Sequence, residues 1–182
     1  MATYKLQNLI RARFPMIYIT TFEEDRVTKY ITSIVTSATQ VKYPREVFTW
    51  TQTAGLYNDT LKKSIPDTTC PCKMLEYVRK YDKDSVFIIY DFHVNFGPKN
   101  RTPDYNVIRK IRDIIPDLKL GAVRKNLFFI APELLIPESL QKEITIFDFP
   151  LPTLAEIKDK FNKMLAQNKN VTIELKEEET DK

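Results

Sequence analysis

A short apolar run, Val86–Tyr90, constrains the fold of this chain more than any other feature of the sequence. The run is continuous rather than alternating, and the polar residues Ser85 and Asp91 bound it. A continuous run of this length is typical of a strand buried on both faces, as in a parallel sheet covered by helices. Ligands of such sheets bind beyond the carboxyl ends of the strands. Asp91 and His93 therefore mark the first place to look for a site.

Four further segments resemble this run and alternate with amphipathic helical segments. The predicted strands are Met16–Thr20, Glu46–Thr51, Ser85–Asp91, Asn126–Ile130 and Ile144–Phe149. The strongest helical periodicity lies at Tyr105–Ile115, which ends in a pair of isoleucines. Alternation of strands and helices indicates an α/β fold with a mostly parallel sheet of about five strands.

Local sequence signals predict the connections between these elements. Two segments, Thr21–Glu24 and Thr153–Glu156, match the capping box that begins many helices. The polar segment Thr53–Thr69 is predicted to be a long loop. The only two cysteines, Cys70 and Cys72, are separated by a single proline, and we expect a plain loop there, with an intermolecular or redox role as the alternative.

Length and composition indicate one globular domain. The chain has 182 residues, of which 43% are hydrophobic and 29% charged. We expect a domain at residues 1–168 and a short strand or charged acidic tail at 169–182. No apolar run reaches the roughly 20 residues that span a bilayer, and the N-terminus lacks a secretory signal. We therefore expect a cytoplasmic location, or an organelle matrix, without a membrane.

The turn after the first strand does not have the sequence that holds nucleotides in P-loop proteins. That loop needs glycines, a lysine and a serine or threonine, whereas Thr20–Asp25 contains no glycine and no lysine. A helix start attracts anions, but acidic side chains at this one oppose them. We therefore predict a fold without Walker A motif, lid or cofactor. The residues of this degenerate turn are Thr20, Thr21, Glu23 and Glu24.

Asp91 also lacks the residue that commonly supports a metal-binding aspartate. A glutamate would orient the attacking water, but the next residue is Phe92. His93 could serve as a general base, because imidazole titrates near neutral pH. A histidine with an ordinary hydrogen bond at a strand end is the favoured interpretation. A nucleotide- or metal-dependent hydrolase using Asp91, His93 and Glu133 is the weaker alternative, and we do not predict an enzyme.

The net charge of +4 is unevenly distributed, because residues 174–182 are acidic and leave +7 on the rest of the chain. Such a balance permits a polyanionic partner. Arg109 and Arg112 lie one turn apart on their predicted helix. The candidate interaction residues are Arg109, Arg112, Lys99, Arg101, Arg124 and Lys125. These residues predict a basic patch that would bind nucleic acid or contact a protein.

Taken together, several motifs resemble one family. They are RARFPMIYITTFEEDRV, VFTWTQTAGL, SVFIIYDFH, VIRKIRDI and LFFIAPELLIPESLQKEITIFDFPLP. In this order they resemble the N-terminal domain of the AAA-plus proteins known as a hypothetical chloroplast reading frame, found in cyanobacteria, plastids and phages. The resemblance covers about Leu9 to Leu165.

The resemblance implies an AAA-like α/β unit without a working P-loop, because in the family a second, C-terminal domain carries the nucleotide motifs. By position, Asp91 matches the aspartate of the family's DFH motif. Arg109, Arg112 and Asp113 match its arginine-rich helix motif. If the resemblance holds, the location would be the cytoplasm, the plastid stroma or the cytoplasm of a phage-infected host.

Two functions remain open at this point, besides the hydrolase. The first is a non-catalytic AAA-plus-like module that binds protein, as a partner or subunit of a complete AAA-plus ATPase or a larger assembly. The second is a nucleic-acid-associated factor that uses the basic loop and helix. Strongly salt-dependent binding to DNA or RNA would favour the second.

Overall fold

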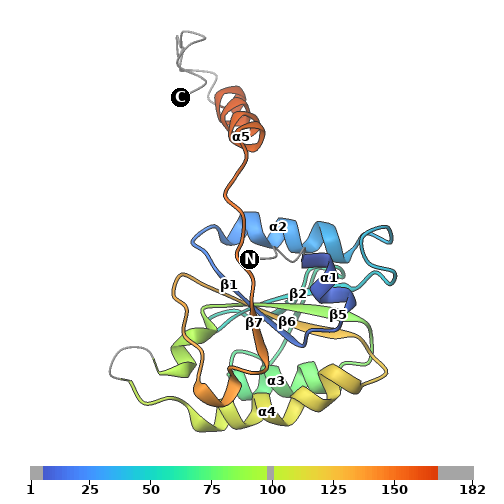
Figure 1. The fold of residues 1–182 in the computed structure, drawn as a ribbon, viewed down its shortest axis with the longest axis vertical. Helices are drawn as coiled ribbons and strands as arrows, with labels where there is room; N and C mark the ends of the chain where they lie inside the picture. Colours follow the sequence, from blue (N-terminus) through green and yellow to red (C-terminus); the bar gives the residue numbers. More distant parts are fainter. Residues whose placement is uncertain (1–5, 98–100, 168–182) are drawn as a thin grey trace. The chain divides into compact units, whose positions relative to one another are not determined.

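The computed structural model describes residues 6–97 and 101–167 and divides the chain into two units, residues 1–149 and 150–182 (Figure 1). The first unit contains the sheet. Its strands are β1 (Met16–Thr20), β2 (Glu46–Thr51), β3 (Gly55–Asn58), β4 (Lys63–Ile65), β5 (Ser85–Tyr90), β6 (Lys125–Ala131) and β7 (Ile144–Ile146). Its helices are α1 (Leu6–Arg11), α2 (Glu24–Val35), α3 (Pro71–Lys80) and α4 (Tyr105–Leu120), with short 3-10 helices η1 (Phe92–Phe96) and η2 (Glu138–Leu140).

The strands form one sheet in the order β4-β3-β2-β5-β6-β1-β7. The five strands from β2 to β7 in this order are parallel, as the sequence predicts, and β3 and β4 join them as antiparallel strands. The first strand, β1, lies between β6 and β7, which come late in the chain. The α/β fold with a mostly parallel sheet is therefore confirmed, with two strands more than predicted.

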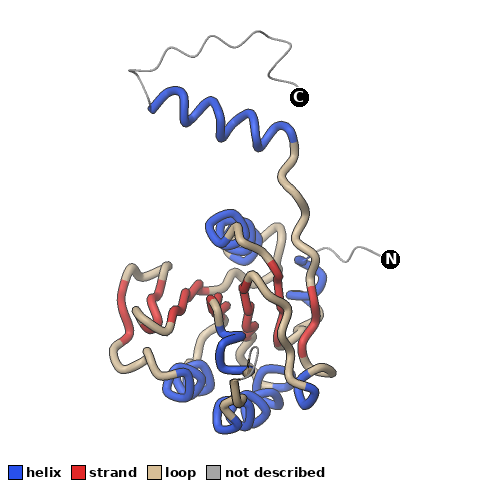
Figure 2. The backbone as a smooth tube through the Cα atoms, turned by 90° about the vertical axis from the view of Figure 1, so that its left-hand side faces the viewer, coloured by secondary structure: helices blue, strands red, loops and turns tan. Residues whose placement is uncertain are grey.

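Helices cover both faces of the sheet (Figure 2). Along β1, Tyr18 packs with α3 and α4 on one face, whereas Ile17 and Ile19 pack with α1 and α2 on the other. All four apolar positions of β1 are fully buried. A strand buried on both faces explains why its sequence is continuously apolar rather than alternating.

Two segments predicted to be loops are regular structure. The polar segment Thr53–Thr69 contains the hairpin β3–β4, in which Gly55 adopts a left-handed φ of 76° and Leu56 is buried. The prediction was wrong because turn residues outnumber apolar ones there. The cysteine segment opens α3, with Pro71 in the first turn, where its missing N–H costs nothing. Both cysteines are free thiols.

The two predicted capping boxes have different outcomes. At α2 the N-cap is Glu23, which makes no side-chain cap hydrogen bond, and the Thr21 hydroxyl instead accepts from the Glu23 N–H at 3.0 Å. The first box is therefore wrong. In the second unit, Glu156 N–H donates to the Thr153 hydroxyl at 3.3 Å, and the Glu156 carboxylate accepts from Thr153 N–H at 2.7 Å. This second box is confirmed.

The second unit contains α5 (Leu154–Gln167), which this box begins. The predicted tail at residues 169–182 lies outside the described residues, so the strand or acidic tail proposed there stays a prediction. The first compact unit ends at Phe149, whereas the domain expected from the sequence ends at residue 168. No helix among the described residues combines the length and apolar character that crossing a membrane requires.

Candidate functional site

The loops that follow β1, β5 and β6 lie at one edge of the sheet, because these three strands are parallel neighbours. We define this carboxyl edge as residues 21–25, 91–97 and 132–135. The Thr21 N–H donates to the Ala131 carbonyl at 2.9 Å, and the Asp91 N–H donates to the Ile130 carbonyl at 2.9 Å. Strand pairing thus continues one residue beyond β1 and β5. These N–H groups are therefore engaged and do not face a ligand.

Asp91 and His93 lie together at this edge, as the sequence predicts. Asp91 occupies the left-handed region with φ 52°, and its side chain is 55% exposed. The His93 side chain is only 11% exposed, and its Nδ1 lies 3.8 Å from Asp91 Oδ1, beyond hydrogen-bond length. Within the described part of the chain, His93 Nδ1 has no hydrogen-bond partner. The geometry shows proximity of the two groups without an acid–base hydrogen bond.

Glu133 contributes its main chain to this edge. The hydroxyl of Tyr18, a buried residue of β1, donates to the Glu133 carbonyl at 2.5 Å. Burial, together with the charges of Asp91 and Glu133, raises the pKa of Tyr18 to about 12. Across the residues that the structure describes, no group of three or more His, Cys, Asp and Glu side chains could hold a metal ion.

The start of α2 is strongly acidic. Partial burial raises the pKa of Glu24, and the charges of Asp91 and Asp25 raise it further. Glu23 forms an ion pair with Arg26 at 2.6 Å. Carboxylates that already repel one another make this helix start unfavourable for a phosphate, although its N–H groups and partial positive charge would otherwise attract one.

The carboxyl edge also carries exposed apolar side chains, one on each of its three loops. Phe22 is 87% exposed, Leu134 51% and Val94 37%. Phe22 follows β1, Val94 follows β5 and Leu134 follows β6. This edge therefore combines large apolar side chains with carboxylates.

The opposite edge of the sheet has a cavity whose lining carries the reverse charge. We define this amino edge as residues 11–15, 41–45 and 121–124, which precede β1, β2 and β6. A cavity of about 280 Å³ opens here. Its lining residues are Arg11, Arg13, Val41, Lys42, Tyr43, Arg45 and Arg124. Among these described lining residues five are basic and none is acidic.

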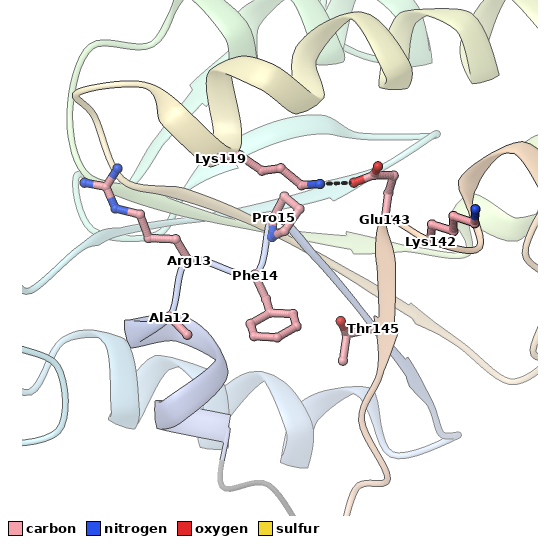
Figure 3. A pocket seen from close by; sticks show the side chains of 8 residues that line it. All are labelled: Ala12, Arg13, Phe14, Pro15, Lys119, Lys142, Glu143 and Thr145. Atoms are coloured by element: carbon pink, nitrogen blue, oxygen red, sulfur yellow. Dashed lines mark ion pairs between the residues drawn. The ribbon is translucent and has the colours of Figure 1, made fainter.

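A second hollow of about 350 Å³ lies beside the first and shares Arg13 with it. Figure 3 shows Lys119 and Glu143 pointing toward each other, with the Phe14 ring and the Thr145 side chain below them in the view. The Lys119 ammonium and the Glu143 carboxylate are 2.5 Å apart. Because the lysine is paired, this hollow offers less free positive charge than the first cavity.

The residues of the predicted basic patch have separate surroundings. Lys125 is buried, and its ammonium donates to the carbonyls of Val78 and Arg79, both at 2.9 Å. Arg124 belongs to the amino edge and pairs with Asp84 at 2.8 Å. A buried lysine that caps a helix is not available to a nucleic acid.

The other members of that patch lie on or near α4. Arg109 pairs with Asp113 at 2.5 Å and Arg112 lines a third hollow, which Glu138 and Glu143 share. Arg101 is exposed, and Lys99 lies outside the described residues. Sequence reasoning missed Arg11, Arg13, Lys42 and Arg45, because only the order of the strands brings them together.

The fold and the order of the parallel strands define an α/β protein of the AAA class. A model of the N-terminal domain of SpoVK-like AAA ATPases matches residues 2–149. The chain therefore belongs to this family, and the resemblance seen in the sequence is confirmed. The matched residues coincide with the first compact unit, which ends at Phe149.

Two curated relatives share the name AAA domain-containing protein ycf46. The protein from Guillardia theta is 34% identical over 152 residues, which cover 82% of this chain and 28% of that relative. The protein from Trieres chinensis is 30% identical over 169 residues, which cover 91% of this chain and 31% of that relative. The chain thus matches less than a third of the length of either relative.

Solved structures of a more distant protein are also similar to this chain. Two variants of RuvB from Thermotoga maritima are 14% and 13% identical, with TM-scores of 0.47 and 0.48. The first similarity covers 88% of this chain and 45% of that chain, and the second covers 93% and 51%.

Proposed function

We propose that this domain is a non-catalytic AAA-like module that works by binding protein, and that its carboxyl edge is the contact surface. The observation that carries the proposal is the combination found at that edge. Strand pairing occupies the N–H groups of Thr21 and Asp91, acidic residues surround the start of α2, and Phe22 is 87% exposed. Exposed apolar side chains of this size are frequent in protein interfaces.

The chemistry of the edge indicates the chemistry of its partner. Glu24, Asp25 and Asp91 give the surroundings of Phe22 a negative charge, so a partner surface with lysine or arginine around an apolar pocket would complement it. The family match concerns the N-terminal domain of an AAA ATPase, and the relatives are more than three times as long as the matched segment. The partner that we propose is therefore an AAA ATPase domain.

A binding experiment tests this partner directly. The probe is the part of the Guillardia theta relative that lies outside its match to this chain, immobilised for interferometry. The double variant Phe22→Ser with Leu134→Ser removes two exposed apolar anchors, and we expect its affinity to fall by about tenfold or more. Leu120→Ser is the matched control, because Leu120 is 85% exposed at the end of α4.

Absence of binding by the unmodified chain, or equal affinity of the double variant and the control, would contradict the proposal. A second measurement addresses catalysis. Calorimetric titration with ATP and Mg²⁺ is expected to give no heat that depends on Asp91. Micromolar binding that Asp91→Ala abolishes would show that the carboxyl edge is a nucleotide site after all.

A further inference from the structure

We propose that the cavity at the amino edge is an anion site that binds the terminal phosphate of a small ligand, with buried Arg45 as its principal donor. This site lies at the end of the sheet opposite to the carboxyl edge. The inference goes beyond the proposed function and does not depend on it. Five basic residues from three separate segments of the chain converge here.

The strongest observation is the side chain of Arg45. It is only 6% exposed, and one terminal nitrogen, Nη2, donates to the Ile10 carbonyl at 3.2 Å. The remaining donors, Nε and Nη1, have no hydrogen-bond partner in the described part of the protein. A buried guanidinium with unsatisfied N–H groups is unfavourable unless an acceptor reaches it. An oxyanion in the cavity would supply that acceptor.

The electrostatic surroundings of Arg45 favour an anion. Burial is the main cause that lowers the pKa of Arg45 to about 10. The negative charge of Asp84 raises this pKa, whereas the positive charges of Arg124 and Arg13 lower it. Arg45 therefore remains charged at neutral pH while other cations repel it. Asp84 is already engaged, since it accepts from both the backbone N–H and the side chain of Arg124, at 2.7 and 2.8 Å. A bound anion would relieve the repulsion.

The backbone and the side chain of Arg13 are both held in place at this edge. The end of α1 is closed by the Arg13 N–H, which donates to the Ile10 carbonyl at 3.2 Å, and by the Phe14 N–H, which donates to the Leu9 carbonyl at 3.1 Å. This closure puts Arg13 in the left-handed region at φ 58°, where glycine is the favoured residue. The Arg13 side chain is also fixed, because its Nη1 donates to the Gly121 carbonyl at 3.0 Å and so keeps the guanidinium at this edge.

The remaining basic residues form the rim. Arg124 lies 3.7 Å from the centre of the Tyr43 ring, and the Lys42 ammonium lies 5.3 Å from the same ring. Arg11 donates to the Thr39 carbonyl at 3.3 Å and is exposed. Stacking on Tyr43 fixes the Arg124 guanidinium, so the rim is in place before a ligand arrives.

The position of Arg45 selects the kind of phosphate. The phosphodiester of a nucleic acid carries a chain on both sides, so it would contact the exposed Arg11 and Lys42 rather than the buried Arg45. A terminal phosphate can enter the cavity of about 280 Å³, which Arg45 lines. Guanidinium donors suit such an ion because their fork geometry matches phosphate oxygens.

Calorimetric titration of the whole chain with pyrophosphate, in a chloride buffer, tests the proposal. We expect saturable binding of one pyrophosphate. Arg45→Met keeps the length of the side chain without its charge and should weaken binding by about tenfold or more. Lys42→Ala changes an exposed rim residue, so it provides the same test in a variant whose folding is not in question. Lys29→Ala, on the exposed face of α2, is the control for net charge.

Binding that persists in Lys29→Ala and weakens in both other variants supports the site. Absence of binding at millimolar pyrophosphate, or equal weakening in all three variants, would overturn it. A single-stranded oligonucleotide without terminal phosphates serves as the second ligand. Suppose that the oligonucleotide binds, that Lys42→Ala weakens this binding, and that pyrophosphate does not bind. The amino edge then recognises a nucleic-acid backbone, and the proposal of a terminal-phosphate site is wrong.

The two proposals can fail separately. If ATP binds and the heat is lost in Arg45→Met but kept in Asp91→Ala, the ligand occupies the amino edge and the interaction role of the carboxyl edge is unaffected. If the heat is instead lost in Asp91→Ala and kept in Arg45→Met, ATP binds at the carboxyl edge and the proposed function is overturned. In that case ATP binding gives no evidence for a site in the amino-edge cavity.

Discussion

The two edges of the parallel sheet differ in charge and in hydrogen bonding. At the carboxyl edge, strand pairing runs past the strand ends, Glu24, Asp25 and Asp91 repel one another, and Phe22 is exposed. At the amino edge, basic residues surround a cavity in which Arg45 has unsatisfied donors. Sheets of this class are expected to bind ligands at the carboxyl edge. Here the unsatisfied guanidinium donors of Arg45 lie at the other end.

This difference shows that a fold class indicates where a site is expected, whereas the side chains decide what each edge can bind. The carboxyl edge lies where ligands of this fold class are expected, but its carboxylates disfavour phosphate. The amino edge has no special place in the fold class, yet it carries the donors that phosphate requires. Paired experiments on the two edges therefore test this difference.

The largest effect is expected at Lys125, which lies at the start of β6. Its buried ammonium caps the carbonyls of Val78 and Arg79 at the end of α3, and burial lowers its pKa. Lys125→Ala should reduce the free energy of unfolding by roughly 3 kcal/mol, because both buried carbonyls lose their donor. Urea denaturation measures this loss. The control Lys119→Ala breaks a half-exposed ion pair and should cost about 1 kcal/mol or less.

The second effect concerns stabilisation by an anion. If the amino-edge cavity binds pyrophosphate, a concentration ten times the dissociation constant should raise the free energy of unfolding by about 1.4 kcal/mol. Thermal unfolding with and without pyrophosphate measures the change, with chloride at equal ionic strength as the reference. Arg45→Met should lose most of this stabilisation, whereas Asp91→Asn should keep it. Equal stabilisation of both variants would remove the contrast between the edges.

The third effect is a pH dependence at the carboxyl edge. The folded-state pKa of Tyr18, about 12, is higher than the ordinary value of 10.0. Above pH 10 the phenol ionises first in the unfolded state, so the stability contributed by Tyr18 is present below pH 10 and is lost as the pH rises toward 12. When the pH rises from 9 to 11, the free energy of unfolding should fall by about 1 kcal/mol less in Tyr18→Phe than in the unmodified chain.

Urea denaturation at the two pH values measures this difference. Tyr105→Phe is the matched control, because Tyr105 is 69% exposed. An identical pH dependence in the unmodified chain and in Tyr18→Phe would show that the buried phenol does not resist ionisation in the folded protein.

The smallest effect is expected for Asp91→Asn. Asparagine tolerates the left-handed backbone at this position, and loss of the charge relieves the repulsion on Glu24. We expect an increase of about 0.5 kcal/mol in the free energy of unfolding. Asp113→Asn, which breaks the ion pair with Arg109, should change stability in the opposite direction. A loss of more than about 1 kcal/mol in Asp91→Asn would mean that the carboxylate has a structural role.

The sequence predicts the parallel sheet well, because strands buried on both faces leave an unmistakable local pattern. The predicted strands at Met16–Thr20 and Glu46–Thr51 have the observed bounds. The hairpin β3–β4 was not predicted, because its second strand, Lys63–Ile65, is short and exposed. A strand stabilised by one neighbour in a polar segment has no periodicity that sequence reasoning can detect.

The two candidate sites differ in how visible they are in the sequence. Asp91 and His93 lie two positions apart, so their proximity follows from the strand that precedes them. Arg13, Arg45 and Arg124 are brought together only by the pairing of β1 with β6 and the placement of β2 in the same sheet. Arg124 was noticed as a basic residue, but its neighbours at the amino edge depend on strand order, which no short stretch of sequence encodes.

The place of β1 in the sheet has a consequence for how the chain is made. Met16 pairs with Leu127, which is synthesised 111 positions later, and β7 follows later still. At cellular translation speeds of 5–20 residues per second, the interval is roughly 6–22 seconds. Throughout it, a strand whose four apolar positions are all buried in the finished fold has no sheet partner. Until β6 is synthesised, β1 therefore remains an apolar segment without a sheet partner, a state that favours aggregation of the nascent chain.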